Sequence, residues 1–283
     1  MTHVLFNAAF PRSNRYDPIW VLEGNMGPNP LWLVEWLTEK MDLQPGMRVL
    51  DLGCGKSLTS IFLAREFDVR VVAADLWTPV DENWKRVVKA GEAERVLPVH
   101  AEAHSLPFAE GYFDAIISID AYAYFGTDVL YLHYLSRLLR GGGQVGVVTP
   151  GLVKEFPNGV VPPHLREPQR NGKVFWESEC VVFKTAEWWR DHFRSCDRVT
   201  VQVADTLPDG WKHWRDYEQA GEQTGLLLFP SDAEALDADR GEHVGFVRVV
   251  AARNAVEGVN LYDPVSCQLA VMSSASGSKE PSP

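Results

Sequence analysis

The residues best placed to do chemistry lie where short apolar runs end in the first half of the chain. The run Val49–Leu52 contains Asp51 and is followed directly by Gly53-Cys54-Gly55. Glycines at the end of a strand let the backbone approach a ligand closely, and the free N–H groups of the next helix can donate to that ligand. Asp51 would repel a pyrophosphate, so the turn suits a ligand that carries an ammonium group.

Two nucleotide-binding motifs share such a turn, and neither fits the sequence. A phosphate loop needs a glycine five residues before Gly55, where Leu50 stands, so Gly55-Lys56-Ser57 is not a Walker motif. A dinucleotide fingerprint needs a third glycine at position 58, where Leu58 stands. Both nucleotide interpretations are therefore weakened.

Two more carboxylates follow the next apolar runs. Asp75 ends the run Val69–Ala74, where a carboxylate can accept hydrogen bonds from both hydroxyl groups of a ribose. Taken alone, Asp75 is explained equally well as the solvated end of a strand. Asp120 ends the run at 113–119, where it can hold an ammonium group, act as a base or cap a loop.

This series resembles the class I S-adenosylmethionine-dependent methyltransferases. Val49–Ser57 resembles their motif I, Asp-x-Gly-x-Gly, although Ser57 stands where many members carry another glycine. Glu102–Phe108 resembles the Asp-Ala-x-x-Leu-Pro-Phe loop of the family, and Leu139–Gly143, with glycines at 141–143, agrees with its glycine turn before the fifth strand. The order and spacing of these segments over residues 46–150 make the resemblance specific.

The resemblance implies an S-adenosyl-L-methionine site and transfer of the methyl group to a small molecule. It implies that the glycine turn wraps the methionine part of the cofactor and that Asp75 binds the ribose. Glu102 would accept the adenine amino group, with the next backbone N–H meeting a ring nitrogen. The expected cofactor-binding residues are Asp51, Gly53, Gly55, Asp75, Leu76, Trp77, Glu102, Ala103 and Asp120.

Catalytic residues are harder to choose, because a sulfonium methyl group is already electrophilic and needs mainly alignment and exclusion of water. His213, Asp120 and Tyr122 are the candidates, His213 because an imidazole can accept a proton near neutral pH. Rival histidines are His104, His133 and His164. Tyr122 can equally be pocket wall or core. The acceptor atom, N, O or C, stays open, and a natural-product tailoring role is a hypothesis.

The elements that must position these groups alternate along the chain. Apolar runs at 48–52, 69–74, 96–100, 113–119 and 144–148 alternate with helical segments, which predicts a parallel sheet with right-handed crossovers. Further strands are expected at 199–204 and 245–252. The predicted fold is α/β: a Rossmann-like, doubly wound, mostly parallel seven-stranded sheet with an antiparallel last strand and a helical or irregular cap.

One domain with additions accounts for the 283 residues. Residues 1–29 are expected to form an irregular segment over the cofactor site, and 30–264 the methyltransferase domain. Insertions at 151–184 and 206–242 are expected to form a substrate cap, and 265–283 a disordered tail. Aromatic residues of the cap either line an apolar pocket or pack the cap onto the domain. Its tryptophans are Trp176, Trp188, Trp189, Trp211 and Trp214.

Composition narrows the expected partners to a small molecule. The net charge of -11 repels phosphate backbones, which argues against nucleic acid. No run approaches the roughly 18 apolar residues of a membrane span, and the start lacks a secretion signal, which predicts a cytoplasmic protein without a membrane partner. Neither Cys-x-x-Cys nor His-Glu-x-x-His occurs, so no metal is predicted. The oligomeric state is left open, a homodimer included.

Two other function classes compete with methyl transfer. A nicotinamide-dependent oxidoreductase would share the sheet and a ribose ligand such as Asp75. However, this sequence has Leu58 where the dinucleotide fingerprint needs a glycine, and that function would leave Glu102–Phe108 without a role. A non-catalytic S-adenosylmethionine-binding protein is not separated by sequence, because methyltransferases share no universal catalytic residue. Turnover to S-adenosylhomocysteine would exclude that second alternative.

Overall fold

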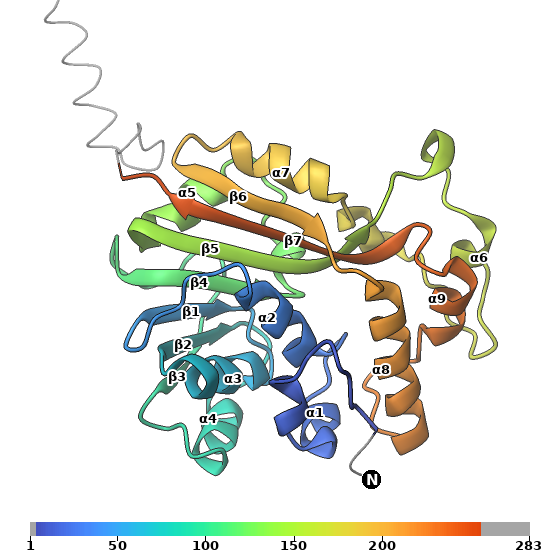
Figure 1. Ribbon diagram of the computed structural model, residues 1–283, viewed down its shortest axis with the longest axis horizontal. Helices are drawn as coiled ribbons and strands as arrows, with labels where there is room; N and C mark the ends of the chain where they lie inside the picture. The colour runs from blue at the N-terminus through green and yellow to red at the C-terminus, as the bar shows by residue number, and fades with distance from the viewer. Residues whose placement is uncertain (1–3, 256–283) are drawn as a thin grey trace, which may run out of the picture.

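A seven-stranded sheet organises residues 4–255, which are the residues that the structure, a computed structural model, describes (Figure 1). The expected tail at 265–283 and the predicted boundary at 264 lie outside them. The strands are β1 (Arg48–Leu52), β2 (Arg70–Asp75), β3 (Val96–His100), β4 (Phe113–Ile119), β5 (Leu139–Leu152), β6 (Val199–Thr206) and β7 (Val244–Arg253). Their order is β3-β2-β1-β4-β5-β7-β6, and β7 runs antiparallel to both neighbours. The predicted mostly parallel sheet with an antiparallel last strand is confirmed.

Helices connect the strands and form most of the second added segment, residues 206–242, whereas the first, residues 151–184, is mainly irregular. They are α1 (Pro18–Glu23), α2 (Pro30–Thr38), α3 (Leu58–Phe67), α4 (Val80–Lys89), α5 (Tyr131–Leu138), α6 (Pro163–Arg166), α7 (Ala186–Arg194), α8 (Gly210–Thr224) and α9 (Ala233–Asp239). Short 3-10 turns occur at η1 (Ser13–Arg15), η2 (Tyr122–Tyr124), η3 (Pro157–Gly159) and η4 (Ser178–Val182). Within residues 4–255, no helix has both the length and the apolar character to cross a membrane.

Local capping explains where several helices begin. The side chain of Asn29 accepts hydrogen bonds from the backbone N–H groups of Leu31 and Trp32, and Pro30 occupies the first helical position of α2. Thr185 caps α7 in the same manner by accepting from the N–H of Trp188. Both helix starts thus depend on residues that are neighbours in the chain.

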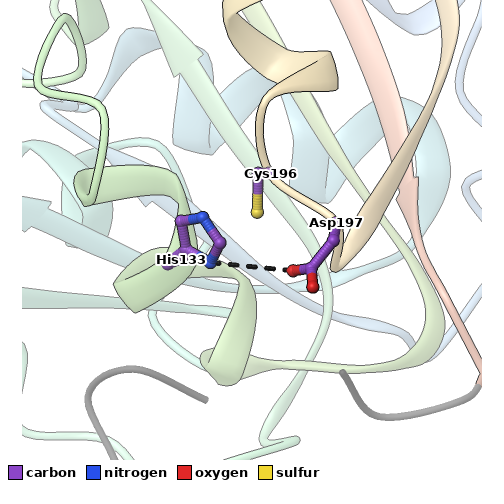
Figure 2. A group of neighbouring side chains, drawn as sticks. All are labelled: His133, Cys196 and Asp197. Carbon is purple, nitrogen blue, oxygen red and sulfur yellow. Dashed lines mark ion pairs between the residues drawn. The ribbon is translucent and has the colours of Figure 1, made fainter. Parts of the chain in front are cut away.

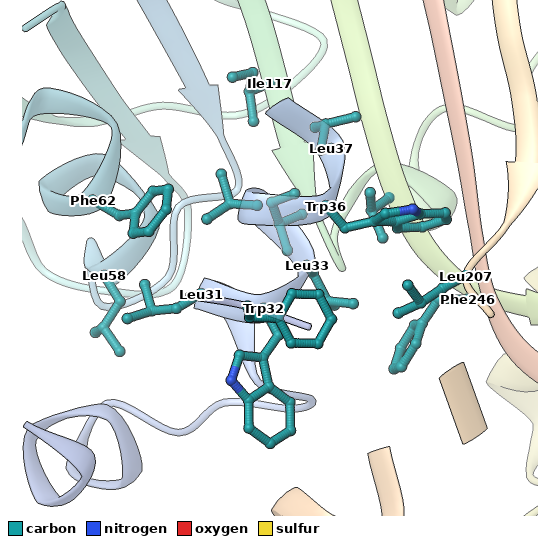
Figure 3. Close-up of a cluster of buried hydrophobic side chains, with 14 of the residues drawn as sticks. Leu31, Trp32, Leu33, Trp36, Leu37, Leu58, Phe62, Ile117, Leu207 and Phe246 are labelled. Carbon is teal, nitrogen blue, oxygen red and sulfur yellow. The ribbon is translucent and has the colours of Figure 1, made fainter. Parts of the chain in front are cut away.

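Helix α2 is buried on all sides and joins several parts of the molecule. Figure 3 shows Trp32, Trp36 and neighbouring leucines of α2 between residues of α3, the sheet and the segment that precedes α8. The indole of Trp32 stacks on Phe10 of the N-terminal segment and meets Tyr217 of α8 edge to face. A helix with apolar residues on all sides must be covered on every side, and the buried carboxylate of Glu35 in α2 accepts the backbone N–H groups of Arg12 and Ser13. The N-terminal segment and α8 provide part of this cover.

The fifth strand differs from its prediction. The glycines at 141–143 were expected to form a turn before a strand at 144–148, but β5 begins at Leu139 and continues to Leu152. Gly142 adopts a positive φ of 76°, and the pairing with β4 shifts register between Phe113 and Ala115. An irregular ladder therefore accommodates the glycines without ending the strand.

The central strands extend unequally toward the insertions. β4 pairs with β5 as far as Ile119 opposite Val148, whereas β7 pairs with β5 as far as Val244 opposite Leu152. The first insertion follows β5 and the second precedes β7, so both join the sheet at this two-stranded extension. Figure 1 shows α6 and α9 beside each other beyond it.

Candidate functional site

A cavity of about 370 Å³ lies at the carboxyl ends of β1, β2 and β4. Its walls come from these strand ends, from the loops that follow them and from the N-terminal segment around Met26 and Gly27. β1 lies between β2 and β4, so the cavity sits where the chain order of the sheet reverses. Open α/β sheets bind their ligands at this position. The topology therefore selects the same place that the sequence motifs indicated.

The turn after β1 needs its glycines for conformation and for space. Gly53 and Gly55 adopt positive φ angles of 75° and 51°. A Cβ atom on Gly53 would lie 2.3 Å from the Cβ of Ala121, and one on Gly55 would lie 2.9 Å from the Sδ of Met26. Ser57, the residue that departs from motif I, also has a positive φ of 61°, a conformation that glycine adopts more readily.

Asp75 holds the two loops that border the cavity. One of its carboxylate oxygens accepts the backbone N–H of Gly55 at 2.9 Å. The other accepts the N–H groups of Trp77 and Thr78 at 2.8 and 2.7 Å. Leu76 and Trp77 follow in the cavity lining, with 49% and 77% of their surface exposed. Asp75 thus fixes the glycine turn of β1 relative to the exposed apolar side chains after β2.

Asp51 lies beneath the cavity and does not line it. Its Oδ2 accepts hydrogen bonds from the hydroxyl groups of Thr59 and Ser60 at 2.5 Å each, while its buried Oδ1 has no hydrogen-bond partner. Burial raises the pKa of Asp51 to about 6. The structure therefore places this carboxylate against the start of α3, below the turn that was expected to wrap a ligand.

The loop after β3 brings one of its two expected residues to the cavity. Glu102 lines the cavity and accepts hydrogen bonds from the backbone N–H and the ring Nδ1 of His104. The hydrogen bond from the His104 side chain lowers the pKa of Glu102. Ala103 lies outside the lining, and its carbonyl oxygen accepts from the hydroxyl of Tyr131.

Asp120 reaches the cavity from the end of β4, opposite the N-terminal segment. Its backbone has a positive φ of 54°, and a Cβ atom on Gly27 would lie 2.4 Å from its Oδ2. Burial raises the pKa of Asp120 to about 7. Tyr124 also lines the cavity, and burial together with the charge of Asp120 raises the pKa of Tyr124 to about 12. A group that titrates near neutral pH therefore faces the cavity.

The structure does not bring His213 to the cavity. His213 lies on α8, where its Nδ1 is 2.9 Å from the side-chain nitrogen of Asn7 and its ring meets Phe10 and Trp32 edge to face. It borders a separate depression between α8 and the N-terminal segment. The prediction failed because α8 packs on α2, away from the carboxyl edge of β1 and β4.

Tyr122 is also absent from the cavity lining. The residue is fully buried, and its ring packs against those of Tyr131, Trp189 and Phe193. Its hydroxyl is buried without a hydrogen-bond partner. The 3-10 turn η2 directs Tyr122 into the core while Tyr124 faces the cavity. Of the three catalytic candidates, Asp120 alone lines the cavity.

The insertions contribute no described residue to the cavity lining. They bind each other instead: Lys173 pairs with Asp232 at 2.8 Å, and the side chain of Asn171 donates to the carbonyl oxygen of Ser231. Trp189 is fully buried, and Trp214 packs on Phe246. Of the two roles considered for the aromatic residues of the cap, the structure supports packing.

Lys56 has a role that the sequence did not reveal. Its ammonium group donates to the backbone carbonyl oxygens of Glu23 and Asn25, at 3.0 and 3.2 Å. The residue next to the glycine turn therefore fastens the N-terminal segment to the wall of the cavity. No short-range pattern could have indicated this contact, because the partners are more than 30 positions apart and are backbone atoms.

Comparison with known proteins agrees with this geometry. Residues 49–143 match the family model described as a methyltransferase domain, a stretch that includes the glycine turn, Asp75, Glu102 and Asp120. Residues 49–143 are thus similar to a methyltransferase domain. Methyltransferase GfsG of Streptomyces halstedii is 29% identical over 133 residues, which are 46% of this chain and 48% of that protein. The chain spans about half the length of the curated relatives it matches.

Solved structures share the fold at low sequence identity. Phosphoethanolamine N-methyltransferase 2 of Haemonchus contortus, in complex with S-adenosyl-L-methionine, has a TM-score of 0.63 and 17% identity, over 88% of this chain and 60% of that one. The [4+2]-cyclase SpnF has a TM-score of 0.59 and 15% identity, over 82% and 84% of the two chains. Because a cyclase has this fold, the fold by itself does not define the reaction.

Proposed function

We propose that the protein is an S-adenosyl-L-methionine-dependent methyltransferase that acts on a small-molecule acceptor. The observation that carries this proposal is the position of one cavity: the Gly53–Gly55 turn, Asp75 and Glu102 border it together, within the stretch that matches a methyltransferase domain. These residues offer a close backbone approach and two carboxylates. That set suits a ligand with hydroxyl and amino groups better than a pyrophosphate.

The cofactor would supply a methyl group on a positively charged sulfur. Asp75 would accept ribose hydroxyl groups, Glu102 would accept the adenine amino group, and Leu76 with Trp77 would cover the ring. A carboxylate offers about four acceptor sites, and Asp75 already uses three of them for backbone N–H groups. Accepting both ribose hydroxyl groups therefore requires the bond to Gly55 to lengthen, so we expect the turn to adjust when the cofactor binds.

Asp120 would act on the side of the cavity where the acceptor enters. As a carboxylate it can pair with an ammonium group or take a proton from the acceptor, and its raised pKa of about 7 suits proton transfer near neutral pH. His213 and Tyr122 have no role in this proposal. The methyl transfer itself needs alignment of the two reactants more than it needs a base.

The N-terminal segment would exclude water from the transfer. Met26, Gly27 and Pro28 form one wall of the cavity, and Lys56 holds the segment there. The second insertion supports the segment from outside: the hydroxyl of Tyr217 donates to the carbonyl oxygen of Val21, and the N–H of Leu228 donates to Asn25. We therefore assign residues 4–29 a covering role and the insertions a supporting one.

Calorimetric titration with S-adenosylmethionine, S-adenosylhomocysteine and NAD tests the proposal. We expect micromolar binding of the first two by the wild type, and at least a tenfold loss, about 1.4 kcal/mol, in Asp75→Asn. Asp81→Asn is the matched control, because Asp81 is exposed on α4 and pairs only with Lys85 at 3.3 Å. An acceptor screen for S-adenosylhomocysteine formation should follow.

Two outcomes would replace the proposal with its alternatives. Binding of NAD without the methionine-derived ligands would indicate an oxidoreductase. Binding of S-adenosylmethionine with no turnover across amine, hydroxyl and carbon acceptors would indicate a binding protein, or chemistry such as that of the cyclase with the same fold.

A further inference from the structure

A second group of ligating side chains lies outside the cavity lining, where α5 packs beside the turn between α7 and β6. Figure 2 shows His133 of α5 and Cys196 and Asp197 of that turn with their side chains directed toward one another. His133 and Cys196 are buried, and Asp197 reaches the surface. The methyltransferase chemistry proposed above uses none of the three.

The polar atoms of this group do not satisfy one another. His133 Nδ1 is buried without a hydrogen-bond partner, and only 9% of the side chain is exposed. The nearest carboxylate oxygen, Oδ1 of Asp197, lies 3.9 Å away, which is too far for a hydrogen bond. A buried ring nitrogen without a partner is costly and calls for an explanation, such as a bound ion.

The spacing suits a single cation. One ligand atom from each residue lies within 4.8 Å of the others. Zinc lies about 2.0–2.1 Å from histidine nitrogen, about 2.0–2.2 Å from carboxylate oxygen and about 2.3 Å from thiolate sulfur. Tetrahedral bonds of these lengths place a nitrogen and an oxygen ligand about 3.4 Å apart. His133 Nδ1 and Asp197 Oδ1 are 3.9 Å apart, so zinc binding requires the exposed Asp197 side chain to move about half an ångström toward His133.

We propose that His133, Cys196 and Asp197 bind a Zn²⁺ ion, with water as the remaining ligand. A thiolate, an imidazole and a carboxylate together favour zinc or cobalt over magnesium or calcium. Binding forms a zinc–sulfur bond and releases the thiol proton of Cys196 to solvent. The ion links α5, which covers one face of the sheet, to the start of the edge strand β6, and so stabilises that edge. The sequence predicted no metal because His133 and Cys196 are far apart in the chain.

A second His/Asp group provides a contrast within the same molecule. His164, Asp239 and His243 also lie within 4.8 Å of one another. Here Asp239 Oδ1 is 2.9 and 3.1 Å from nitrogens of the two histidines, and its Oδ2 accepts the backbone N–H groups of His243 and Val244. Four hydrogen bonds therefore account for the Asp239 carboxylate without an ion. The contrast lies in this carboxylate alone, because His243 Nε2, like His133 Nδ1, is buried without a hydrogen-bond partner and lies 3.9 Å from the nearest carboxylate oxygen, Oε1 of Glu242.

Titration of the full chain with Co²⁺, followed by competition with Zn²⁺, tests the proposal. We expect one ion per chain, a thiolate-to-cobalt charge-transfer band that Zn²⁺ removes, and a higher Tm with either metal. Cys196→Ser should lose the charge-transfer band, and His133→Gln should lose stoichiometric binding. Circular dichroism reports whether these buried substitutions still fold.

Exposed positions keep the test independent of folding. Asp197→Asn removes a ligand at the surface and should weaken cobalt binding at least tenfold, whereas Asp191→Asn, on the exposed side of α7, should leave it unchanged. A wild-type protein without the thiolate band overturns the proposal. Loss of the ion in His164→Gln but not in Asp197→Asn also overturns it, because the ion would then lie in the second group. Neither result bears on methyl transfer.

Discussion

The cavity at the carboxyl edge of the sheet and the paired insertions beside it use polar side chains in opposite ways. In the cavity, Glu102 and Asp120 come from strand ends and face open space. In the insertions, Lys173 meets Asp232 and His164 meets Asp239, so the polar groups are used to hold the chain together. The aromatic residues of the insertions therefore lie outside the cavity lining, whereas acidic residues at strand ends lie in it.

Gly53→Ala should produce the largest effect on cofactor binding, because it adds a methyl group to the turn that borders the cavity. The new methyl group would lie 2.3 Å from the Cβ of Ala121 and would force a side chain into a φ of 75°. We expect S-adenosylmethionine binding to fall at least a hundredfold in calorimetry, about 2.7 kcal/mol. Gly91→Ala is the matched control, since Gly91 has a φ of 76° and no atom within 4 Å of the added Cβ. Equal losses in both variants would refute a steric role for the turn.

Asp239→Asn tests the insertion side. The Asp239 side chain is fully buried and accepts hydrogen bonds that join α6, α9 and the start of β7, so the substitution should lower the free energy of unfolding by roughly 2–4 kcal/mol. The affinity of the folded protein for S-adenosylmethionine should change less than about twofold. Urea denaturation and calorimetry measure the two quantities. Asp237→Asn, half exposed beside Arg215, should cost less than about 1 kcal/mol. A large loss of affinity for S-adenosylmethionine in Asp239→Asn would show that the insertions contribute to binding as well as to stability.

Asp120→Asn should trade stability against function. Burial raises the pKa of Asp120 from 3.8 to about 7, so the folded state holds its proton more tightly than the unfolded state. The stability from this proton is complete below about pH 4, falls as the pH rises, and is lost above about pH 7. At pH 8 the variant should therefore be more stable than the wild type by up to about 4 kcal/mol, and at pH 4 the two should be nearly equal. Thermal unfolding at both pH values measures this. Methyl transfer should decrease in the variant. Equal stability of the variant and the wild type at pH 8 would contradict the raised pKa of Asp120.

Trp211→Phe should have the smallest effect. Trp211 lies at the start of α8, with the guanidinium group of Arg215 over its ring and Gly241 against its edge. It lies outside the cavity lining, so KM and kcat for an acceptor should stay within about twofold, while stability falls by about 0.5–1 kcal/mol. Steady-state kinetics decide the point. A tenfold rise in KM would restore the insertions as a substrate-binding cap.

The sequence was sufficient where spacing along the chain determines structure. The strand at 48–52 and the carboxylate at the end of β2 follow from residues that are close neighbours, and the structure places both as expected. The direction of a side chain within a turn could not be predicted in this way. Tyr122 and Tyr124 are two positions apart, yet one enters the core and the other the cavity.

Long-range packing accounts for the other failures. His213 was a candidate because an imidazole can accept a proton near neutral pH, but α8 lies against α2 and the N-terminal segment, so His213 packs against Phe10 and Trp32. The role of Lys56 depends on backbone carbonyl oxygens near residue 24, which no residue pattern specifies. Glycines at 141–143 normally favour a turn, but here they lie between Leu139 and Gln144, which both pair with β4, at the point where the register of that pairing shifts.

The contacts of the N-terminal segment have a consequence for biosynthesis. Residues 24–30 leave the ribosome early, but the hydrogen-bond partners of this region are made much later. Leu228, which bonds to Asn25, is 203 positions further along the chain, and Tyr217, which bonds to Val21, is 196 positions further along. Closing such long loops costs entropy that only the completed contacts repay. During translation the wall formed by Met26 and Gly27 therefore lacks its outer support until most of the chain has been made. Ligand capture by ribosome-bound chains of increasing length would accordingly appear late and abruptly.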